Sequence, residues 1–263
     1  EGNQTSQWLE ATSWLARGAG IAGQWVLAEK YASDALAGSA LPAGVQQLDA
    51  DPNLATALGA SIEVLGKAYD ARGDRTAAVE FLREQHKKYL GTSIETRIQK
   101  NVLLLSLEGK PLPDLEMPEY VFDRPAAPGQ VNGKVLLLYF WAHWCSDCKR
   151  QEPVLELLHN NYSDRGLAFI GPTKLYGYTA QAREATPSEE LDYLRDAYQE
   201  NYPIHPWMPA PVSTRNFLRF GVSSTPTLVL VDRKGIVRLY HPGYLGYSEL
   251  EERIEPLLNA AGK

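Results

Sequence analysis

The sequence predicts an all-α domain over residues 1–109, followed by an α/β domain over residues 110–263. In the first part, apolar residues recur at helical spacing between capping residues and glycines. The second part contains an almost wholly apolar run, residues 135–141, which is typical of a strand buried on both faces of a sheet. A Cys-x-x-Cys pair and a helical pattern follow that run directly.

Local start and stop signals place the helices of the first domain. Asp51 is an expected N-cap, with Pro52 at the first helical position. Thr92 and Glu95 have the spacing of a capping box, and Gly18 is expected to end the first helix. We expect helices over residues 6–17, 23–37, 52–72, 75–90 and 92–108, with a loop over residues 38–50.

The composition excludes several classes of function. The chain has 263 residues, of which 44% are apolar and 22% charged, as in an ordinary globular protein of one or two domains. Its net charge of -6 argues against nucleic acid or an anionic membrane surface as a partner. No apolar run approaches the ~18 residues that span a bilayer. The polar residues 1–7 do not resemble a signal peptide, which fits a mature or trimmed chain.

Both cysteines of the chain, Cys145 and Cys148, lie where the predicted strand passes into a helix. Free N–H groups and the helix dipole favour a thiolate at Cys145, and Cys148 lies one turn later, where it can close a disulfide. The pattern predicts thiol–disulfide exchange. A zinc site is the rival interpretation, but it needs further ligands, and the five histidines are scattered singly. We expect no metal, no cofactor beyond the disulfide, and a partly exposed His143.

These motifs resemble the TlpA/ResA-like branch of exported thioredoxin-fold thiol–disulfide oxidoreductases. The resemblance covers residues 112–258. It implies a central mixed sheet flanked by helices, with a strand–helix insertion between the two motifs. The residues that carry it are Gly133, Lys134, Val135, Phe140, Trp141, Trp144, Cys145, Cys148, Lys149, Pro153, Thr225, Pro226, Thr227 and residues 228–235.

The resemblance also implies roles for individual residues. Cys145 is the expected nucleophile and Cys148 the resolving thiol. Pro226 is expected to be cis and to pack beside the disulfide. Trp144 is expected to form an apolar wall, and the Thr225 backbone to pair with an extended substrate. The implied partners are protein thiol or disulfide substrates and a redox partner, and the implied location is the periplasm or cell exterior.

The sequence departs from the family at several positions. Tyr139 stands where thioredoxin has a buried Asp, and Gln151 stands where ResA-type proteins have a Glu. Glu152 is therefore the candidate proton acceptor for Cys148, with a solvated surface Glu as the favoured alternative. Asp147 should oppose the helix dipole, raise the pKa of Cys145 and favour a reductase. Ala142 replaces the Thr of peroxiredoxins, which argues against peroxidase activity.

The remaining elements of the second domain are expected as follows. The proline-rich residues 110–130 form a linker and an edge element. Residues 202–211 form either a lid that shapes a substrate groove or, as we favour, the inserted strand with a stiff loop. We expect strands over residues 166–171, 227–232 and 236–241, and helices over residues 186–202, 214–220 and 248–260.

The third and fourth helices of the first domain resemble a tetratricopeptide unit. The matching residues are Leu65, Gly66, Tyr69, Gly73, Ala78 and Leu82. Two interpretations stay open: a helical surface that binds a protein partner or forms a dimer, and an extension that packs on the redox domain. The favoured function is a thiol–disulfide oxidoreductase, more a reductase than an oxidase. The alternative is a partner-binding helical protein whose redox domain is regulatory or residual.

Overall fold

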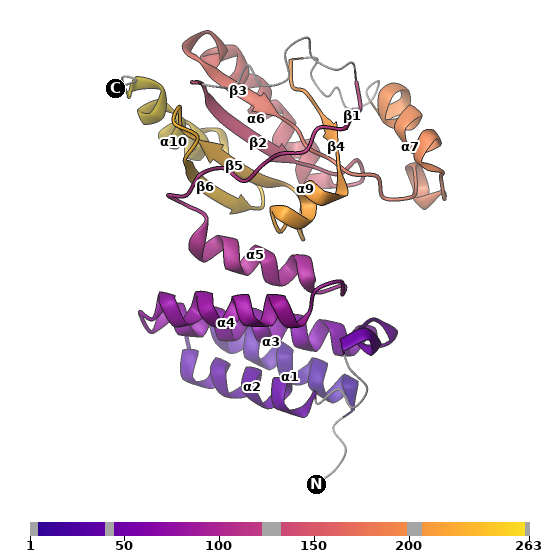
Figure 1. Cartoon of the computed structure of the whole chain (residues 1–263), viewed down its shortest axis with the longest axis vertical. Helices are drawn as coiled ribbons and strands as arrows, with labels where there is room; N and C mark the ends of the chain where they lie inside the picture. Colours follow the sequence, from indigo (N-terminus) through magenta and orange to yellow (C-terminus); the bar gives the residue numbers. More distant parts are fainter. Residues whose placement is uncertain (1–4, 40–44, 123–132, 199–206, 261–263) are drawn as a thin grey trace. The chain divides into compact units, whose positions relative to one another are not determined.

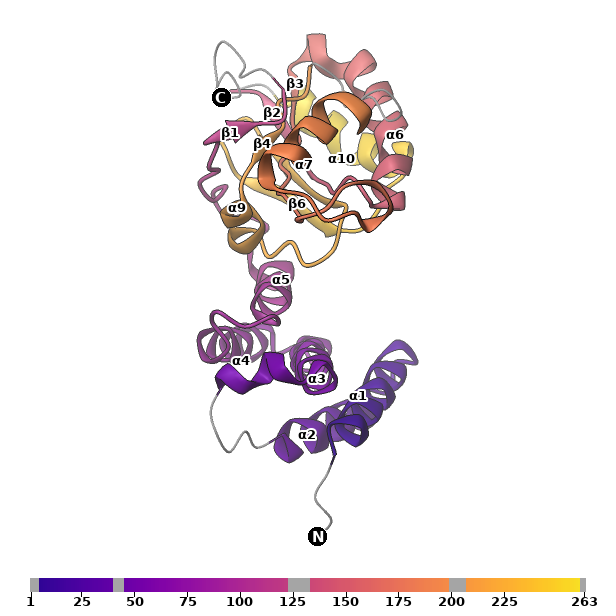
Figure 2. The same cartoon turned by 90° about the vertical axis from the view of Figure 1, so that its right-hand side faces the viewer.

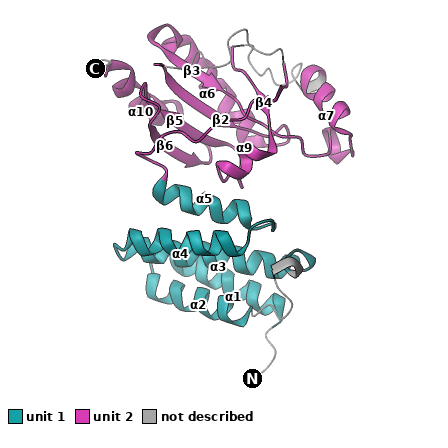
Figure 3. Ribbon diagram, viewed as in Figure 1, with its two compact units in different colours: residues 1–106 teal, residues 107–263 magenta. Residues whose placement is uncertain are grey.

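The computed structural model describes residues 5–39, 45–122, 133–198 and 207–260 (Figure 1). The chain divides into two compact units, residues 1–106 and residues 107–263 (Figure 3). Among the residues described, no helix combines the length and the apolar character that a membrane crossing requires.

The first unit is helical, as predicted. It contains α1 (Ser6–Ile21), α2 (Trp25–Gly38), a short 3-10 helix (Val45–Ala50), α3 (Pro52–Ala71), α4 (Arg75–Lys88) and α5 (Glu95–Ser106). Helix α3 packs against α1 and α2 on one side and against α4 and α5 on the other. Two apolar clusters fill these interfaces, a small-residue cluster under α1 and α2 and a larger one under α4 and α5.

The residues that resemble a tetratricopeptide unit lie at the α3–α4 interface. A Cβ added at Gly66 would lie 2.8 Å from Cδ1 of Leu82, so the glycine is what lets the two helices approach there. The ring of Tyr69 meets Phe81 edge-on at 5.4 Å. Gly73 ends the turn between the helices with φ +85°. Membership of the repeat class stays a prediction.

Two helix boundaries in this unit differ from the predictions. Helix α1 continues through Gly18 to Ile21, because Ala16 and Ala19 are buried in the small-residue cluster and packing outweighs the low helix propensity of glycine. The capping box at Thr92 does not form. The Thr92 hydroxyl donates to the Tyr89 carbonyl, and the Glu95 carboxylate accepts the Gly91 N–H instead.

The second unit is built on a mixed four-stranded sheet, which confirms the predicted fold class. The strands are β2 (Val135–Phe140), β3 (Leu167–Ile170), β5 (Thr227–Val231) and β6 (Val237–Pro242), in the order β3-β2-β5-β6. Strand β2 is parallel to β3 and antiparallel to β5, and every residue of β2 is buried. The central position of β2 explains its almost wholly apolar sequence.

Helices cover the sheet on both faces (Figure 2). Helices α6 (Ser146–Tyr162) and α10 (Tyr247–Asn259) share one apolar cluster with Val135, Leu137 and Tyr139 of β2. On the other face, α9 (Thr214–Arg219) brings Phe217 within 5.6 Å of the Phe140 ring. Because side chains alternate along a strand, β2 serves both layers at once. Helix α10 begins after an N-cap at Gly246 and not at the predicted Ser248.

A smaller second sheet pairs β1 (Glu119–Tyr120) with β4 (Pro211–Val212). The edge element expected over residues 110–130 therefore pairs at two places. Glu119 and Tyr120 join β4, and the Lys110 carbonyl accepts the N–H of Val237 at the start of β6 in the central sheet. Residues 202–206 of the predicted lid or inserted strand, and the end of the helix predicted over residues 186–202, lie outside the described residues. Helix α7 (Pro187–Tyr193) starts at the predicted Thr186 capping box and continues as a π-type turn (Leu194–Tyr198).

Candidate active site

The cysteine pair lies where β2 turns into α6. After β2, the Cys145 N–H donates to the Ala142 carbonyl at 3.1 Å and closes a turn whose central residues are His143 and Trp144. Cys145 is the N-cap of α6, and its Sγ accepts the Cys148 N–H at 3.1 Å. The predicted position of the first cysteine at a helix N-terminus is therefore confirmed.

Cys145 and Cys148 form a disulfide with their Cα atoms 5.2 Å apart. Cys145 is 5% exposed, whereas Cys148 is fully buried. An incoming sulfur can therefore reach Cys145 but not Cys148. This difference in exposure agrees with the roles that the family resemblance implies.

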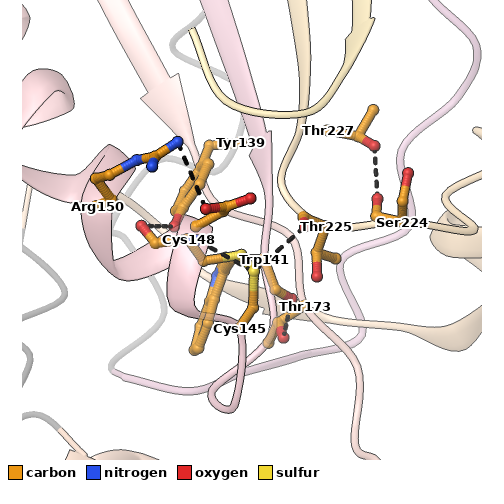
Figure 4. Close-up of a disulfide and its surroundings, with 10 residues drawn as sticks. Tyr139, Trp141, Cys145, Cys148, Arg150, Thr173, Ser224, Thr225 and Thr227 are labelled. Atoms are coloured by element: carbon orange, nitrogen blue, oxygen red, sulfur yellow. Dashed lines mark hydrogen bonds and ion pairs between the residues drawn. A yellow bond between two sulfur atoms is a disulfide. The ribbon is translucent and has the colours of Figure 1, made fainter. Parts of the chain in front are cut away.

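The second motif lies directly beside the disulfide (Figure 4). The Thr225–Pro226 peptide bond is cis, and the Thr225 carbonyl oxygen lies 3.3 Å from Sγ of Cys145. Strand β5 begins at the next residue, and its Thr227 pairs with Phe140 of β2. The pairing of β2 with β5 thus brings together two motifs that are distant in the sequence.

The structure explains two departures from the family. The Tyr139 hydroxyl donates to the Cys148 carbonyl at 2.8 Å and so joins β2 to the first turn of α6. Gln151 makes a pair of hydrogen bonds with the backbone of Leu245: its Nε2 donates to the carbonyl at 2.9 Å, and its Oε1 accepts the N–H at 3.0 Å. An amide is suited to this pair because it both donates and accepts.

Replacing Gln151 by Glu should therefore destabilise the second unit by about 2 kcal/mol, since a carboxylate cannot donate to the buried Leu245 carbonyl. Urea unfolding of the full chain measures the loss. Asn160→Asp is the matched control, because it makes the same amide-to-acid change at an exposed position on α6 and should cost less than about 0.5 kcal/mol. Equal effects of the two changes would contradict a structural role for the Gln151 amide.

Glu152, the candidate proton acceptor, lies one turn after Cys148 on α6. It is 6% exposed, so the favoured expectation of a solvated surface side chain is wrong. No sequence pattern indicates this burial, because Glu is rarely buried. Its role as a proton acceptor stays a prediction.

Charged and aromatic side chains lie on the residues next to the two cysteines. Asp147 is exposed, and one of its carboxylate oxygens lies 3.5 Å from the Arg150 guanidinium. That guanidinium also lies over the Tyr244 ring, 4.2 Å from its centroid. Trp144 is 50% exposed and meets the Tyr176 ring edge-on at 5.5 Å. Trp144 and Tyr176 thus form one apolar surface, and the sequence did not indicate the part of Tyr176; the role of Trp144 as an apolar wall beside the sulfurs stays a prediction.

His143 is buried, at 4% exposure, and the prediction of a partly exposed side chain is wrong. Its Nε2 lies 3.3 Å from Oε1 of Glu190, which is itself fully buried. Burial lowers the pKa of His143, and the Glu190 carboxylate reverses only part of this shift. No periodicity or motif links the two residues, so the sequence could not reveal the contact.

Within the described parts of the chain, no three His, Cys, Asp or Glu side chains are placed to share a metal ion. His143 faces the Glu190 carboxylate and the rings of Tyr176, Tyr178 and Tyr193.

Comparison with known proteins finds a family and several proteins that are similar to this chain. The family described as "Thioredoxin-like domain" matches residues 129–257. The chain is 26% identical over 149 residues to the thioredoxin-like protein YneN of Bacillus subtilis, covering 56% of this chain and 79% of YneN. It is 27% identical over 156 residues to the thiol:disulfide interchange protein DsbE of Xylella fastidiosa, covering 58% of this chain and 70% of DsbE. It is 25% identical over 126 residues to the thiol-disulfide oxidoreductase ResA of Halalkalibacterium halodurans, covering 48% of this chain and 64% of ResA.

Proposed function

We propose that this chain, in which residues 129–257 are a thioredoxin-like domain, is a thiol–disulfide oxidoreductase that reduces disulfides in proteins. The resemblance predicted from the sequence is confirmed by the family match and by relatives named DsbE and ResA. The observation that carries the proposal is the cysteine pair itself: a reachable sulfur caps a helix, and a buried sulfur lies one turn behind it.

In the proposed reaction the chain begins as a dithiol. The Cys145 thiolate attacks one sulfur of a substrate disulfide, forming a mixed disulfide and releasing the other sulfur as a thiolate, which takes up a proton. The Cys148 thiolate then attacks Sγ of Cys145 and releases the second substrate thiol. Two electrons have passed to the substrate, and the chain is left with the Cys145–Cys148 disulfide. A dithiol redox partner must reduce it again.

The substrate is proposed to bind against the groups around Cys145. Trp144 offers an exposed apolar face, and Tyr176 extends it. The Thr225 backbone lies beside Sγ of Cys145, where it can pair with an extended substrate segment, and Pro226 follows it without an N–H of its own.

The same resemblance to exported proteins supports a location outside the cytoplasm. A protein partner for the helical unit is a further part of the proposal, supported by exposed Ile21 and Val26 at the junction of α1 and α2.

The reductive direction is supported by the charge beside the nucleophile. Asp147 lies in the first turn of α6, where its negative charge opposes the helix dipole and makes the Cys145 thiolate less favourable. A less stable thiolate makes the dithiol form a better electron donor. Arg150 neutralises part of this charge, so the effect is smaller than that of an isolated Asp.

Replacing Asp147 by His should lower the pKa of the Cys145 thiol, by up to about one unit, and raise the reduction potential of the pair. Thiol titration of the reduced chain measures the pKa. Glu156→His is the matched control, because Glu156 is an exposed acid on the same helix but roughly 16 Å along it from Cys145. An unchanged Cys145 pKa in Asp147→His, or an equal change in the control, would contradict this account of Asp147.

The direction is tested by the reduction potential of the pair, measured by equilibrating the full chain with defined thiol–disulfide buffers. We expect about -250 mV or lower, in the range of reducing proteins. A value near about -120 mV would identify an oxidant and contradict the reductive direction. A pair that does not cycle at all would overturn the proposed function.

A further inference from the structure

We propose that His143 is a positioning residue of the redox site, and that its buried contact with Glu190 holds Trp144 and Cys145 in place. The inference rests on the proposed function and adds to it. Within the part of the chain that the structure describes, His143 makes no hydrogen bond with either sulfur, so its effect must pass through the turn that it belongs to.

The backbone of His143 is part of the active-site turn. The turn between Ala142 and Cys145 is closed by one hydrogen bond, and His143 and Trp144 are its central residues. Trp144 is half exposed, so its side chain does little to anchor the turn. The buried ring of His143 is the side chain that can fix it.

Three tyrosines enclose the His143 ring. Tyr176, Tyr178 and Tyr193 each meet it edge-on, with ring centroids at 5.9, 5.4 and 5.6 Å. Such edge-to-face contacts favour one orientation of the ring. In that orientation Nε2 lies 3.3 Å from Oε1 of the Glu190 carboxylate.

Glu190 connects this ring to two further segments. It lies on α7, and its carboxylate accepts the N–H groups of Tyr176, at 2.8 and 3.0 Å, and of Gly177, at 2.7 Å. A buried carboxylate with several hydrogen-bond donors is held rigidly, because releasing any of them leaves a charge unsatisfied. One carboxylate thus joins α7, the loop containing Tyr176 and the active-site turn.

The consequence at the redox site is the placement of the apolar wall. Tyr176 is fixed through its backbone by Glu190, and its ring meets Trp144 at 5.5 Å with the planes 85° apart. Trp144 directly precedes Cys145. Loss of the His143–Glu190 contact would therefore loosen the turn and the loop together and displace Trp144 and Tyr176, against which a protein substrate is proposed to bind.

The test compares single variants in the full chain, with steady-state reduction of a disulfide-bonded protein such as insulin as the readout. His143→Phe keeps an aromatic ring but removes the contact with Glu190. We expect kcat/KM for the protein disulfide to fall about tenfold, while the reaction with a small disulfide reagent changes less than about twofold. His143→Gln keeps a side-chain N–H donor and should restore most of the loss. Glu190→Gln should reproduce the His143→Phe defect even if His143→Phe folds poorly.

The matched control is His159→Phe, on α6. His159 also packs among aromatic rings, stacked on Trp207 at 3.9 Å, but its ring contacts among the described residues are with Phe169 and Trp207 and not with the active-site turn. Wild-type kinetics in both His143→Phe and Glu190→Gln would overturn the inference and leave the proposed function standing. An equal loss in His159→Phe would overturn it too, because the effect would be general destabilisation. An inactive wild-type chain would instead refute the proposed function.

Discussion

Replacing Cys145 by Ser should abolish disulfide exchange, whereas replacing Cys148 by Ser should leave a chain that attacks once and stays bound to its substrate. The two outcomes differ because the cysteines differ in position. Cys145 is the reachable sulfur at the helix start, and Cys148 is fully buried behind it. A serine hydroxyl cannot replace the thiolate as nucleophile at neutral pH, so the rate in Cys145→Ser should fall to that of the reaction without protein.

In Cys148→Ser the first step remains and the second is lost. The mixed disulfide between Cys145 and the substrate therefore accumulates, and non-reducing electrophoresis with mass spectrometry detects it as a covalent adduct. Cys145→Ser provides the control, because it keeps Cys148 and should form no adduct. A stable adduct through Cys148 in Cys145→Ser would mean that the two roles are reversed.

Replacing Glu63 by Gln should destabilise the helical unit by about 3 kcal/mol at neutral pH. Glu63 lies on α3 with its side chain 9% exposed, and Lys67, Arg97 and Lys100 surround it at 2.7, 3.0 and 3.7 Å. Burial alone would raise its pKa, but the charges of Lys100, Lys67 and Arg97 outweigh burial and lower the pKa from 4.5 to about 2. A shift of this size corresponds to about 3 kcal/mol of stability.

Part of that gain is offset by the cations themselves. Burial lowers the pKa of Lys100. The Glu63 carboxylate raises this pKa, whereas repulsion from Arg97 and Lys67 lowers it further, and the net shift is downward. We still expect Glu63→Gln to lower the stability of the helical unit by about 3 kcal/mol, since the substitution leaves three neighbouring cations without their carboxylate.

The pH dependence follows from the direction of the Glu63 shift. Its folded pKa of about 2 lies below the ordinary 4.5, so the unfolded chain binds the proton more readily. The stabilisation is complete above about pH 4.5 and is lost as the pH falls toward about 2. In Glu63→Gln this part of the acid sensitivity should disappear.

Hydrogen exchange of the α3 and α5 amides in the full chain measures the effect on the helical unit alone. Glu29→Gln is the matched control, because the Glu29–Arg72 pair is more exposed and should contribute less than about 1 kcal/mol. An equally small change in Glu63→Gln would contradict the account of this buried cluster.

The sequence predicted the features that depend on neighbouring residues. The buried strand β2, the position of Cys145 at the start of α6 and the Thr186 capping box are all encoded within short stretches of chain. The family resemblance added the pairing of the cysteine and Thr225–Pro226 motifs, which no local pattern implies.

The sequence could not predict features that depend on contacts between distant residues. Nothing near His143 indicates that Glu190 will meet it, and nothing near Gln151 indicates the backbone of Leu245. The length of α1 was underestimated for the same reason, since glycines that would end an isolated helix are tolerated where Ala16 and Ala19 pack against other helices. Charged and polar side chains that are buried by tertiary contacts, such as Glu152, are the residues most easily misjudged.

The central claim is that Cys145 and Cys148 pass two electrons to a protein disulfide, and a single turnover tests it most directly. The pre-reduced full chain is mixed with an excess of disulfide-bonded insulin, and free thiols on both proteins are alkylated and counted by mass. We predict that each chain loses two thiols while one substrate disulfide opens, and that the chain is recovered with the Cys145–Cys148 disulfide. The account would be contradicted if both cysteines were still free thiols after prolonged incubation, so that both are alkylated, and no substrate disulfide had opened.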